Sequence, residues 1–252
     1  TSEMIETLRI ATYNIHKGFS NFNRRAILHD VRDRLRMLDA DLIFLQEVQG
    51  SNEVHGINHT LWTAPQHEFL ADSVWGDFAY GKNAVYEEGH HGNAILSRFP
   101  IVSWENEDVS AHPLERRGLL HCELDIPGWD QPLHCVCVHL GLFSRWRAQQ
   151  ARALCDRIDR MVPHGAPLVI AGDFNDWREQ LSHLLRERLD AHEVFEATRG
   201  RPARSFPAGL PILSLDRIYV RGLRVKSARL MRGKAWSKLS DHAALSAHVS
   251  RA

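Results

Sequence analysis

The sequence predicts an α/β (α+β) fold in which two β-sheets pack as a sandwich with helices outside them. Short apolar runs typical of strands outnumber the helical segments along the 252 residues. Some neighbouring strand-like runs, such as residues 119–125 and 133–138, follow one another with no helix between them. A βα barrel would place a helix after each strand, so this order favours a sandwich. No linker, repeat or low-complexity tract divides the chain, and we expect one domain over residues 1–252.

The first part of the chain predicts two strands, one helix and a long irregular segment. Residues 9–13 and 41–45 are short apolar runs typical of strands. Between them, apolar side chains recur at helical spacing over residues 24–39, at Ile27, Leu28, Val31, Leu35 and Leu38. Residues 50–90 mix Gly, Asn, His and aromatic residues without periodicity, and we expect them to be irregular.

The rest of the chain predicts six more strands and two helices. The strands are expected at residues 93–98, 119–125, 133–138, 168–171, 218–220 and 244–249. Ser144 is a candidate N-cap for a helix, whose expected inner face is Ala148, Ala151, Leu154, Ile158 and Met161. A second helix is expected near residues 179–189.

Composition and charge exclude several classes of protein. Hydrophobic residues make up 44% and charged residues 25%, which is ordinary for a globular protein. The 31 basic and 31 acidic residues balance, so no global field favours nucleic acid or an anionic membrane. Residues 199–234 nevertheless hold ten Lys or Arg and one acid, Asp216. This basic segment is either a set of solvated strand faces or an electropositive wall beside a phosphate-bearing substrate.

The cysteines and the apolar runs bear on the compartment. The four cysteines, at 122, 135, 137 and 155, are too few for a disulfide scaffold and lack the His or Cys partners of a zinc site. We expect buried, reduced thiols, with Cys135 and Cys137 on one face of a strand. No run approaches the ~20 apolar residues of a membrane span. We expect a cytoplasmic location, and the sequence leaves room for peripheral membrane association.

Polar side chains stand at the ends of six apolar runs, after five of them and before the last. They are Asn14, then Gln46 with Glu47, His139, Asp173 with Asn175, Asp216, and Asp241 with His242. Any one of them alone would be explained by a turn, because Asp and Asn bond the local backbone. Ser, Gly and Pro would share these positions if turns were the whole explanation, so the set predicts a functional site.

The residue types in this set indicate metal-assisted chemistry at phosphorus. Glu47, Asp241 and Asn14 offer the hard oxygen ligands that Mg²⁺ or Mn²⁺ prefers, and the set contains no thiolate. His139, His242 and Asn175 are suited to donate hydrogen bonds to phosphoryl oxygens. Asp173 and Asp216 are left to orient or deprotonate a water molecule.

These motifs in their order resemble the endonuclease/exonuclease/phosphatase (deoxyribonuclease I-like) superfamily. They are TYNIHKG (12–18), LQEV (45–48), GNAILSRFPI (92–101), VHLGL (138–142), AGDFND (171–176), LDRIYV (215–220) and SDHAAL (240–245). Together they cover nearly the full length. The resemblance implies a four-layer sandwich of two mainly antiparallel sheets flanked by helices, with the site at one edge. It also implies a hydrolase for phosphate esters, as in nucleases, sphingomyelinases and inositol polyphosphate 5-phosphatases.

Matching positions imply a role for each residue of the set. Asn14 and Glu47 stand where the family holds its divalent metal, and Asp241 stands at a further metal-proximal carboxylate. Asp173 matches the residue that orients or deprotonates the attacking water, and Asn175 matches its phosphate-binding neighbour. His242 matches the site histidine, with Asp216 as the carboxylate that fixes its tautomer.

Two positions depart from the abasic-site endonucleases of this superfamily. His139 stands where those enzymes have a tyrosine, which aligns the chain with the nuclease, sphingomyelinase and 5-phosphatase branches. His16 stands where they carry an acid, which weakens the expectation of a second metal ligand.

The substrate stays open at this level. Arg145 and Trp146 follow VHLGL, and Trp177 follows Asn175, so they are candidates for stacking bases or seating at a lipid interface. Helix packing explains Trp146 equally well. His91 and Asn93 are candidate substrate contacts, with local structure as the alternative. The function expected is hydrolysis of a phosphodiester in nucleic acid or phospholipid. The alternatives are a phosphomonoesterase on an inositol-type or other soluble phosphate and a non-catalytic binding module; no obligate protein partner is evident.

Overall fold

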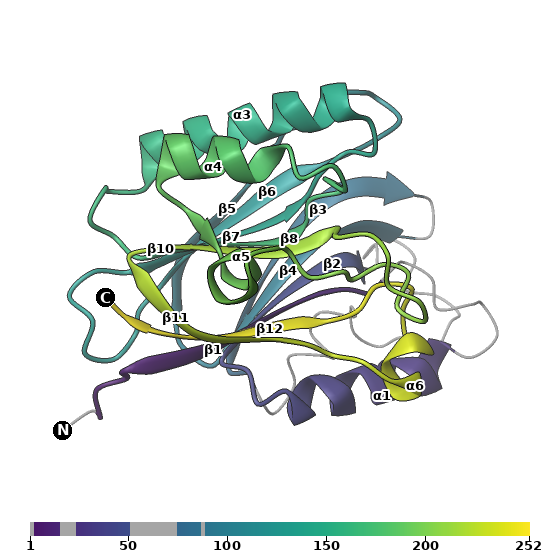
Figure 1. Cartoon of the computed structure of the whole chain (residues 1–252), viewed down its shortest axis with the longest axis horizontal. Helices are drawn as coiled ribbons and strands as arrows, with labels where there is room; N and C mark the ends of the chain where they lie inside the picture. The colour runs from purple at the N-terminus through teal and green to yellow at the C-terminus, as the bar shows by residue number, and fades with distance from the viewer. Residues whose placement is uncertain (1–2, 16–23, 51–74, 87–88) are drawn as a thin grey trace.

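Two six-stranded β-sheets face each other in the computed structural model of the chain (Figure 1). The structure describes residues 3–15, 24–50, 75–86 and 89–252. The first sheet has the order β11-β12-β1-β2-β4-β3 and the second the order β5-β6-β7-β8-β10-β9. Each sheet is antiparallel except for one parallel pair at its centre.

The strands of the first sheet are β1 (Thr7–Asn14), β2 (Leu42–Gly50), β3 (Asp77–Tyr86), β4 (Gly89–Ser97), β11 (Leu223–Leu230) and β12 (Leu245–Arg251). Those of the second are β5 (Ile101–Asp108), β6 (Gly118–Leu124), β7 (Leu133–His139), β8 (Leu168–Asp173), β9 (His192–Glu193) and β10 (Asp216–Arg221). The helices are α1 (Arg24–Met37), α3 (Ser144–Met161), α4 (Leu181–Leu189), α5 (Val194–Arg199) and α6 (Lys234–Ser237).

At the centre of each sheet, a helix connects two parallel strands. Helix α1 connects the parallel strands β1 and β2, and α3 connects the parallel strands β7 and β8. In Figure 1, α3 and α4 cover the outer face of the second sheet, and α1 and α6 lie on the side of the first. The molecule therefore has four layers, helix, sheet, sheet and helix, as the resemblance implied.

Successive side chains of a strand point to opposite faces. This alternation separates the apolar core between the two sheets from the two cores between each sheet and its helices. In β1, Leu8 and Ile10 point into the core between the sheets, whereas Ala11 and Tyr13 pack with α1. In β7 the cysteines Cys135 and Cys137 share the inter-sheet face, as predicted, and all four cysteines are free thiols in buried positions. Burial of whole alternating faces is the main stabilising contribution of such a sandwich.

Several elements differ from the sequence prediction. The expectation that residues 50–90 are irregular is wrong for residues 77–86, which form β3, and residues 51–74 lie outside the described part. Strands β5 and β11 were not predicted, because many of their side chains are exposed and polar. Ser144 is the first helical residue of α3, and Phe143 occupies the N-cap. Met161 is exposed rather than on the inner face, because α3 ends there.

Candidate functional site

The polar residues at the strand ends continue the inter-sheet face of each strand. Asn14 follows Leu8 and Ile10 in the alternation of β1, and Asp173 follows Val169 and Ala171 in β8. The same alternation places His139 and Asp216 on the inter-sheet side of β7 and β10. The site is therefore an extension of the central core in which polar side chains replace apolar ones.

Strand register brings these ends to the same edge of the sandwich. His139 is the direct partner of Asp173 in the parallel β7–β8 ladder. Asp216 pairs with Asp173 across the antiparallel β8–β10 ladder, so it begins its strand where β8 ends. The apolar run before Asp216, residues 212–215, forms no strand, so Asp216 begins a strand and does not end one.

Asp173 is the centre of the site. Its Oδ2 accepts a hydrogen bond of 2.9 Å from Asn14 Nδ2, which comes from the opposite sheet. The same oxygen lies 3.5 Å from His139 Nε2 and 3.7 Å from His242 Nε2, distances of ion pairs and not of hydrogen bonds. Its Oδ1 accepts from the backbone N–H of Asn175 at 3.0 Å. One buried carboxylate thus contacts four of the predicted site residues.

His242 is held by a chain of hydrogen bonds behind it. Its Nδ1 lies 2.8 Å from Asp216 Oδ2, so Nδ1 carries the proton that this bond requires. The Ser205 hydroxyl donates to the same oxygen at 2.6 Å. Ser240 Oγ accepts from the His242 backbone N–H at 3.1 Å and donates to the Asn14 carbonyl at 2.7 Å. Nε2 of His242 therefore faces Asp173.

Glu47 reaches the site through a β-bulge. Alternation along β2 would send an odd-numbered side chain to the α1 face, as for Ile43 and Leu45. The β2–β4 register shifts between Leu45 and Val48, and Glu47 has a left-handed φ of 57°. A bulge re-aims the side chain, and Glu47 Oε1 lies 3.9 Å from His139 Nε2. The strained conformation, which costs about 1–3 kcal/mol, is thus used to place a carboxylate beside the site.

The turn after β8 combines local structure with the site. The bond from Asn175 N–H to Asp173 Oδ1 closes an Asx-type turn, and Asn175 has a φ of 49°, which Asn tolerates. Asn175 Nδ2 donates to the Leu140 carbonyl at 2.7 Å. Gly172 has a φ of 147°, and a Cβ there would lie 2.0 Å from the Val138 carbonyl oxygen. The close approach of β7 and β8 beside Asp173 therefore requires glycine.

The pKa values in the site are displaced by burial and by neighbouring charge. Burial, together with the Asp216 carboxylate, raises the pKa of Asp173 to about 7, against the opposing effect of His242. Burial alone would lower the pKa of His242, but Asp216 and Asp173 raise it to about 10. His242 therefore favours its cationic form, and Asp173 holds a proton more readily than an ordinary aspartate.

Oxygen and nitrogen atoms of the site are close enough to hold a cation. One ligand atom each of Asp173, Asp216 and His242 lie within 4.8 Å of one another. Asp216 Oδ1 is buried and has no hydrogen-bond partner among the residues that the structure describes. Glu47 adds a carboxylate at the His139 side, and Asp241 contributes to the raised pKa of its neighbour His242. The carboxylate oxygens of this set suit a hard divalent ion, whereas His242, held in its cationic form by Asp216 and Asp173, offers it no free nitrogen.

The candidate substrate residues have different surroundings. Arg145 is exposed at the start of α3. Trp146 is half-buried and stacks on His112 with ring centroids 4.9 Å apart, which favours the packing explanation. Asn93 is buried and donates to the Gly118 and Cys137 carbonyls, which favours local structure. His91 is a half-buried residue of β4. His16 lies outside the described residues.

Two serines that support the site were not assigned a role from the sequence. Ser205 holds Asp216 from a loop, and its partner comes 11 residues later, so no periodicity links them. Ser240 directly precedes Asp241 and His242, and that adjacency was the available signal. Arg217, the residue after Asp216, is fully buried against Asp176 at 3.0 Å and fixes the start of β10.

Residues 11–242 match the Endonuclease/Exonuclease/phosphatase family. The chain belongs to this family. Its members are generally hydrolases that act on phosphoesters and use a divalent metal. The two-sheet sandwich and the cluster of polar strand ends described above are the form this family fold takes in the present chain.

Relatives in sequence and in structure agree with this membership. The Uncharacterized protein YbhP of Escherichia coli K12 is 47% identical over 244 residues, which cover 96% of each chain. The solved endonuclease/exonuclease/phosphatase from Bacteroides vulgatus has a TM-score of 0.77 at 17% identity and covers 98% of this chain and 99% of its own. D. rerio TDP2, solved with a single-strand DNA product, has a TM-score of 0.73 at 18% identity and covers 97% and 99%.

No helix in the described part of this family member has the length and apolar character needed to cross a bilayer.

Proposed function

We propose that the chain is a Mg²⁺-dependent phosphoesterase that hydrolyses a phosphodiester. The observation that carries this proposal is the convergence on Asp173 Oδ2 of side chains from both sheets, with Asn14 at 2.9 Å, His139 at 3.5 Å and His242 at 3.7 Å. The hydrogen bonds of this carboxylate come from the Asn14 amide and the Asn175 backbone N–H. The two imidazoles border the same oxygen, and a phosphoryl group bound beside Asp173 would contact them.

Each of these residues has its own role in the proposed reaction. Asp173, with its pKa raised to about 7, accepts a proton from water as the water oxygen bonds to phosphorus and the ester oxygen leaves. The His242 cation, held by Asp216, stabilises the negative charge that develops on the phosphoryl oxygens. His139 and the second N–H of the Asn175 amide are placed to donate to the same oxygens.

Glu47, Asn14 and Asp241 are the residues that would hold the ion. A bound Mg²⁺ or Mn²⁺ supplies charge neutralisation at the phosphoryl group and favours the deprotonated form of water. The bulge at Glu47 supports this assignment, because the protein maintains a strained backbone there to bring a carboxylate to the site.

A diester substrate has support from the surface next to the site. Trp177 is exposed two residues after Asn175, and the Arg178 guanidinium lies 4.6 Å from its ring centroid. An exposed aromatic ring with an arginine is suited to a base and its phosphate or to a phospholipid headgroup at an interface. The single-strand DNA product bound to D. rerio TDP2 makes the nucleic-acid strand the first substrate to test.

The test is a substrate panel read with Mg²⁺ and with chelator. It compares single-stranded DNA, RNA, phospholipids and inositol phosphates, together with bis-aryl and mono-aryl phosphates that separate diester from monoester cleavage. We expect Mg²⁺-dependent turnover of a diester, and Asp173→Asn should lower it by roughly 10²–10⁴-fold. Asp125→Asn, at an exposed aspartate between β6 and β7, is the matched control and should keep full activity. Full activity of Asp173→Asn would refute the assignment, and turnover of monoesters alone would establish the phosphomonoesterase alternative.

A further inference from the structure

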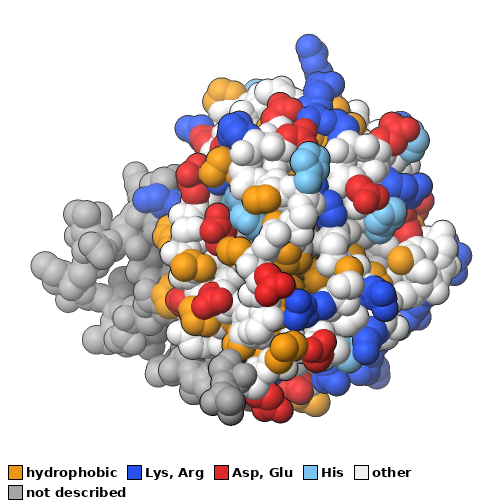
Figure 2. Space-filling model, turned by 90° about the vertical axis from the view of Figure 1, so that its left-hand side faces the viewer, with side chains coloured by type: hydrophobic (Ala, Val, Ile, Leu, Met, Phe, Trp, Pro, Cys, Tyr) orange, Lys and Arg blue, Asp and Glu red, His pale blue; other side chains and the backbone are white. Residues whose placement is uncertain are grey.

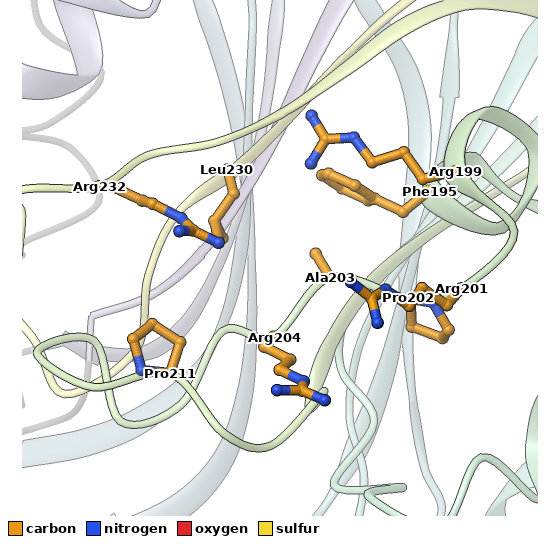
Figure 3. A pocket seen from close by; sticks show the side chains of 9 residues that line it. All are labelled: Phe195, Arg199, Arg201, Pro202, Ala203, Arg204, Pro211, Leu230 and Arg232. Atoms are coloured by element: carbon orange, nitrogen blue, oxygen red, sulfur yellow. The ribbon is translucent and has the colours of Figure 1, made fainter.

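A second notable feature of the structure is a pocket lined by four arginines. It has a volume of about 300 Å³ and is formed by the end of α5, residues 201–204 and 211, and the chain at the end of β11. Figure 3 shows Arg232 approaching from one side and Arg199 and Arg201 from the other, with Arg204 completing the set. None of the residues proposed for catalysis or metal binding lines this pocket.

These four guanidinium groups are not neutralised by carboxylates in the described part of the chain. Arg188, an arginine elsewhere on the surface, is paired: it lies 2.6 Å from Asp159 and 3.2 Å from Asp156. The acid nearest in sequence, Glu196 on α5, is paired with Arg186 at 3.2 Å. On the end of the sandwich that holds the chain termini, Figure 2 shows basic and acidic side chains interspersed. The pocket is therefore a local concentration of positive charge in a chain whose formal net charge is +0.

The pocket has an ordered wall as well as charge. Arg199 Nη2 donates to the Ala228 carbonyl at 3.0 Å, and its guanidinium lies 5.3 Å from the centroid of the buried Phe195 ring. The buried residues Pro202 and Ala203 form the rest of the floor. An arginine fixed in this way loses little conformational entropy when it binds an anion.

The number and type of cations indicate the chemistry of the ligand. Guanidinium groups bind phosphate oxygens through paired N–H donors. One phosphomonoester carries about −1.5 to −2 charges at pH 7, so two adjoining phosphates come closest to balancing four arginines. The concave shape favours a compact ligand over an extended strand.

We propose that this pocket is a binding site for a small ligand with two or more adjoining phosphate groups, separate from the catalytic site. The site stands on the geometry of the four arginines and does not depend on the hydrolytic function proposed above. A chain that binds such a ligand here and hydrolyses no ester would keep this site and lose that function.

Calorimetric titration of the full chain with inorganic pyrophosphate, in the presence of chelator, tests the proposal. We compare the wild type with Arg201→Gln/Arg232→Gln, which removes two pocket charges. The matched control is Arg224→Gln/Lys226→Gln, which removes two charges from exposed positions of β11 outside the pocket. We expect one pyrophosphate per chain, binding at least tenfold weaker in the pocket variant and within twofold of wild type in the control.

Two further titrations, with inorganic phosphate and with ADP, identify the chemical class of the ligand. Inorganic phosphate should bind at least tenfold more weakly than pyrophosphate, and ADP should compete with pyrophosphate. An ADP affinity equal to that of pyrophosphate would mean that only the phosphates are recognised, and a higher one would mean that the nucleoside contributes. Equal losses in the two variants, no saturable binding, or phosphate binding as tightly as pyrophosphate would overturn the proposal. Pocket-dependent binding of an oligonucleotide without pyrophosphate binding would overturn it in favour of a nucleic-acid surface.

Discussion

Asn14 and Asp173 are 159 residues apart in the chain, and the Asn14 side-chain amide donates a 2.9 Å hydrogen bond to Asp173 across the two sheets. This bond joins the ends of the parallel pairs β1–β2 and β7–β8, which are the corresponding centres of the two sheets. The site is therefore built where two similar halves of the fold meet, with one half supplying the amide and the other the carboxylate.

Removing that amide should impair activity more than folding. A hydrogen bond to a charged group contributes about 1.5–3 kcal/mol, so Asn14→Ala should lower kcat/KM by roughly 10–100-fold. Gln131→Ala, which removes an exposed amide in the turn before β7, should leave kcat/KM unchanged. Steady-state kinetics together with circular dichroism separate the two effects. An active Asn14→Ala protein would show that activity needs neither this bond nor Asn14 as a metal ligand.

Glu47 allows strain and charge to be tested separately. Glycine accepts a φ of 57° without strain, so Glu47→Gly should raise the free energy of unfolding by about 1 kcal/mol and abolish the metal-dependent activity. Glu47→Gln keeps the strain and removes the charge, so it should lose the same activity without gaining stability. Chemical denaturation and Mg²⁺ titration of activity measure both. A Glu47→Gly protein less stable than the wild type would show that the bulge is not strained.

The sequence indicated which polar side chains lie close together in the structure, but not how they are arranged. Asn14, His139 and Asp173 each follow an apolar run and stand in a motif of the family, and the sequence indicated them on that ground. The supporting bond from Ser205 to Asp216 joins a loop to a strand start, and no local pattern encodes it.

The absence of a local sequence pattern also explains why two strands were not predicted. Strands β5 and β11 are largely solvent-facing, and their polar side chains lack the apolar signal on which strand prediction depends. Their positions are fixed by backbone pairing with β6 and β12, which becomes apparent only in the folded sheets.

A buried histidine pair should make the fold sensitive to acid. The side chain of Arg157 donates from Nε to His121 Nδ1 at 3.0 Å, and His121 Nε2 lies 2.9 Å from His134 Nδ1. Burial, with Arg157 and His134 as further causes, lowers the pKa of His121 to about 3 from 6.5, and burial also lowers the pKa of His134. The unfolded chain therefore binds more protons than the folded one below pH 6.5, and stability is lost as the pH falls towards 3.

The loss should not exceed about 1.4 kcal/mol per pH unit for each histidine. Urea denaturation in steps below pH 6.5 measures it. His121→Asn retains an acceptor for Arg157 and should have a shallower pH dependence, whereas His183→Asn, at an exposed position of α4, should follow the wild type. Identical slopes in wild type and His121→Asn would contradict the assignment of acid sensitivity to this pair.

Gly172 should be among the least replaceable residues of the chain. In Gly172→Ala the new Cβ would lie 2.0 Å from the Val138 carbonyl oxygen, at a φ of 147° that an alanine rarely adopts. Relief requires β7 and β8 to separate next to His139 and Asp173, and we expect a loss of about 4 kcal/mol or more in the free energy of unfolding. Gly209→Ala is the matched control, because a Cβ there meets no atom within 4 Å, and its stability should stay within about 0.5 kcal/mol of wild type. If Gly172→Ala does not yield folded protein, a comparison of soluble yields of the two variants gives the same contrast. A Gly172→Ala protein as stable and active as Gly209→Ala would show that the ladder between β7 and β8 can open without displacing the residues of the site.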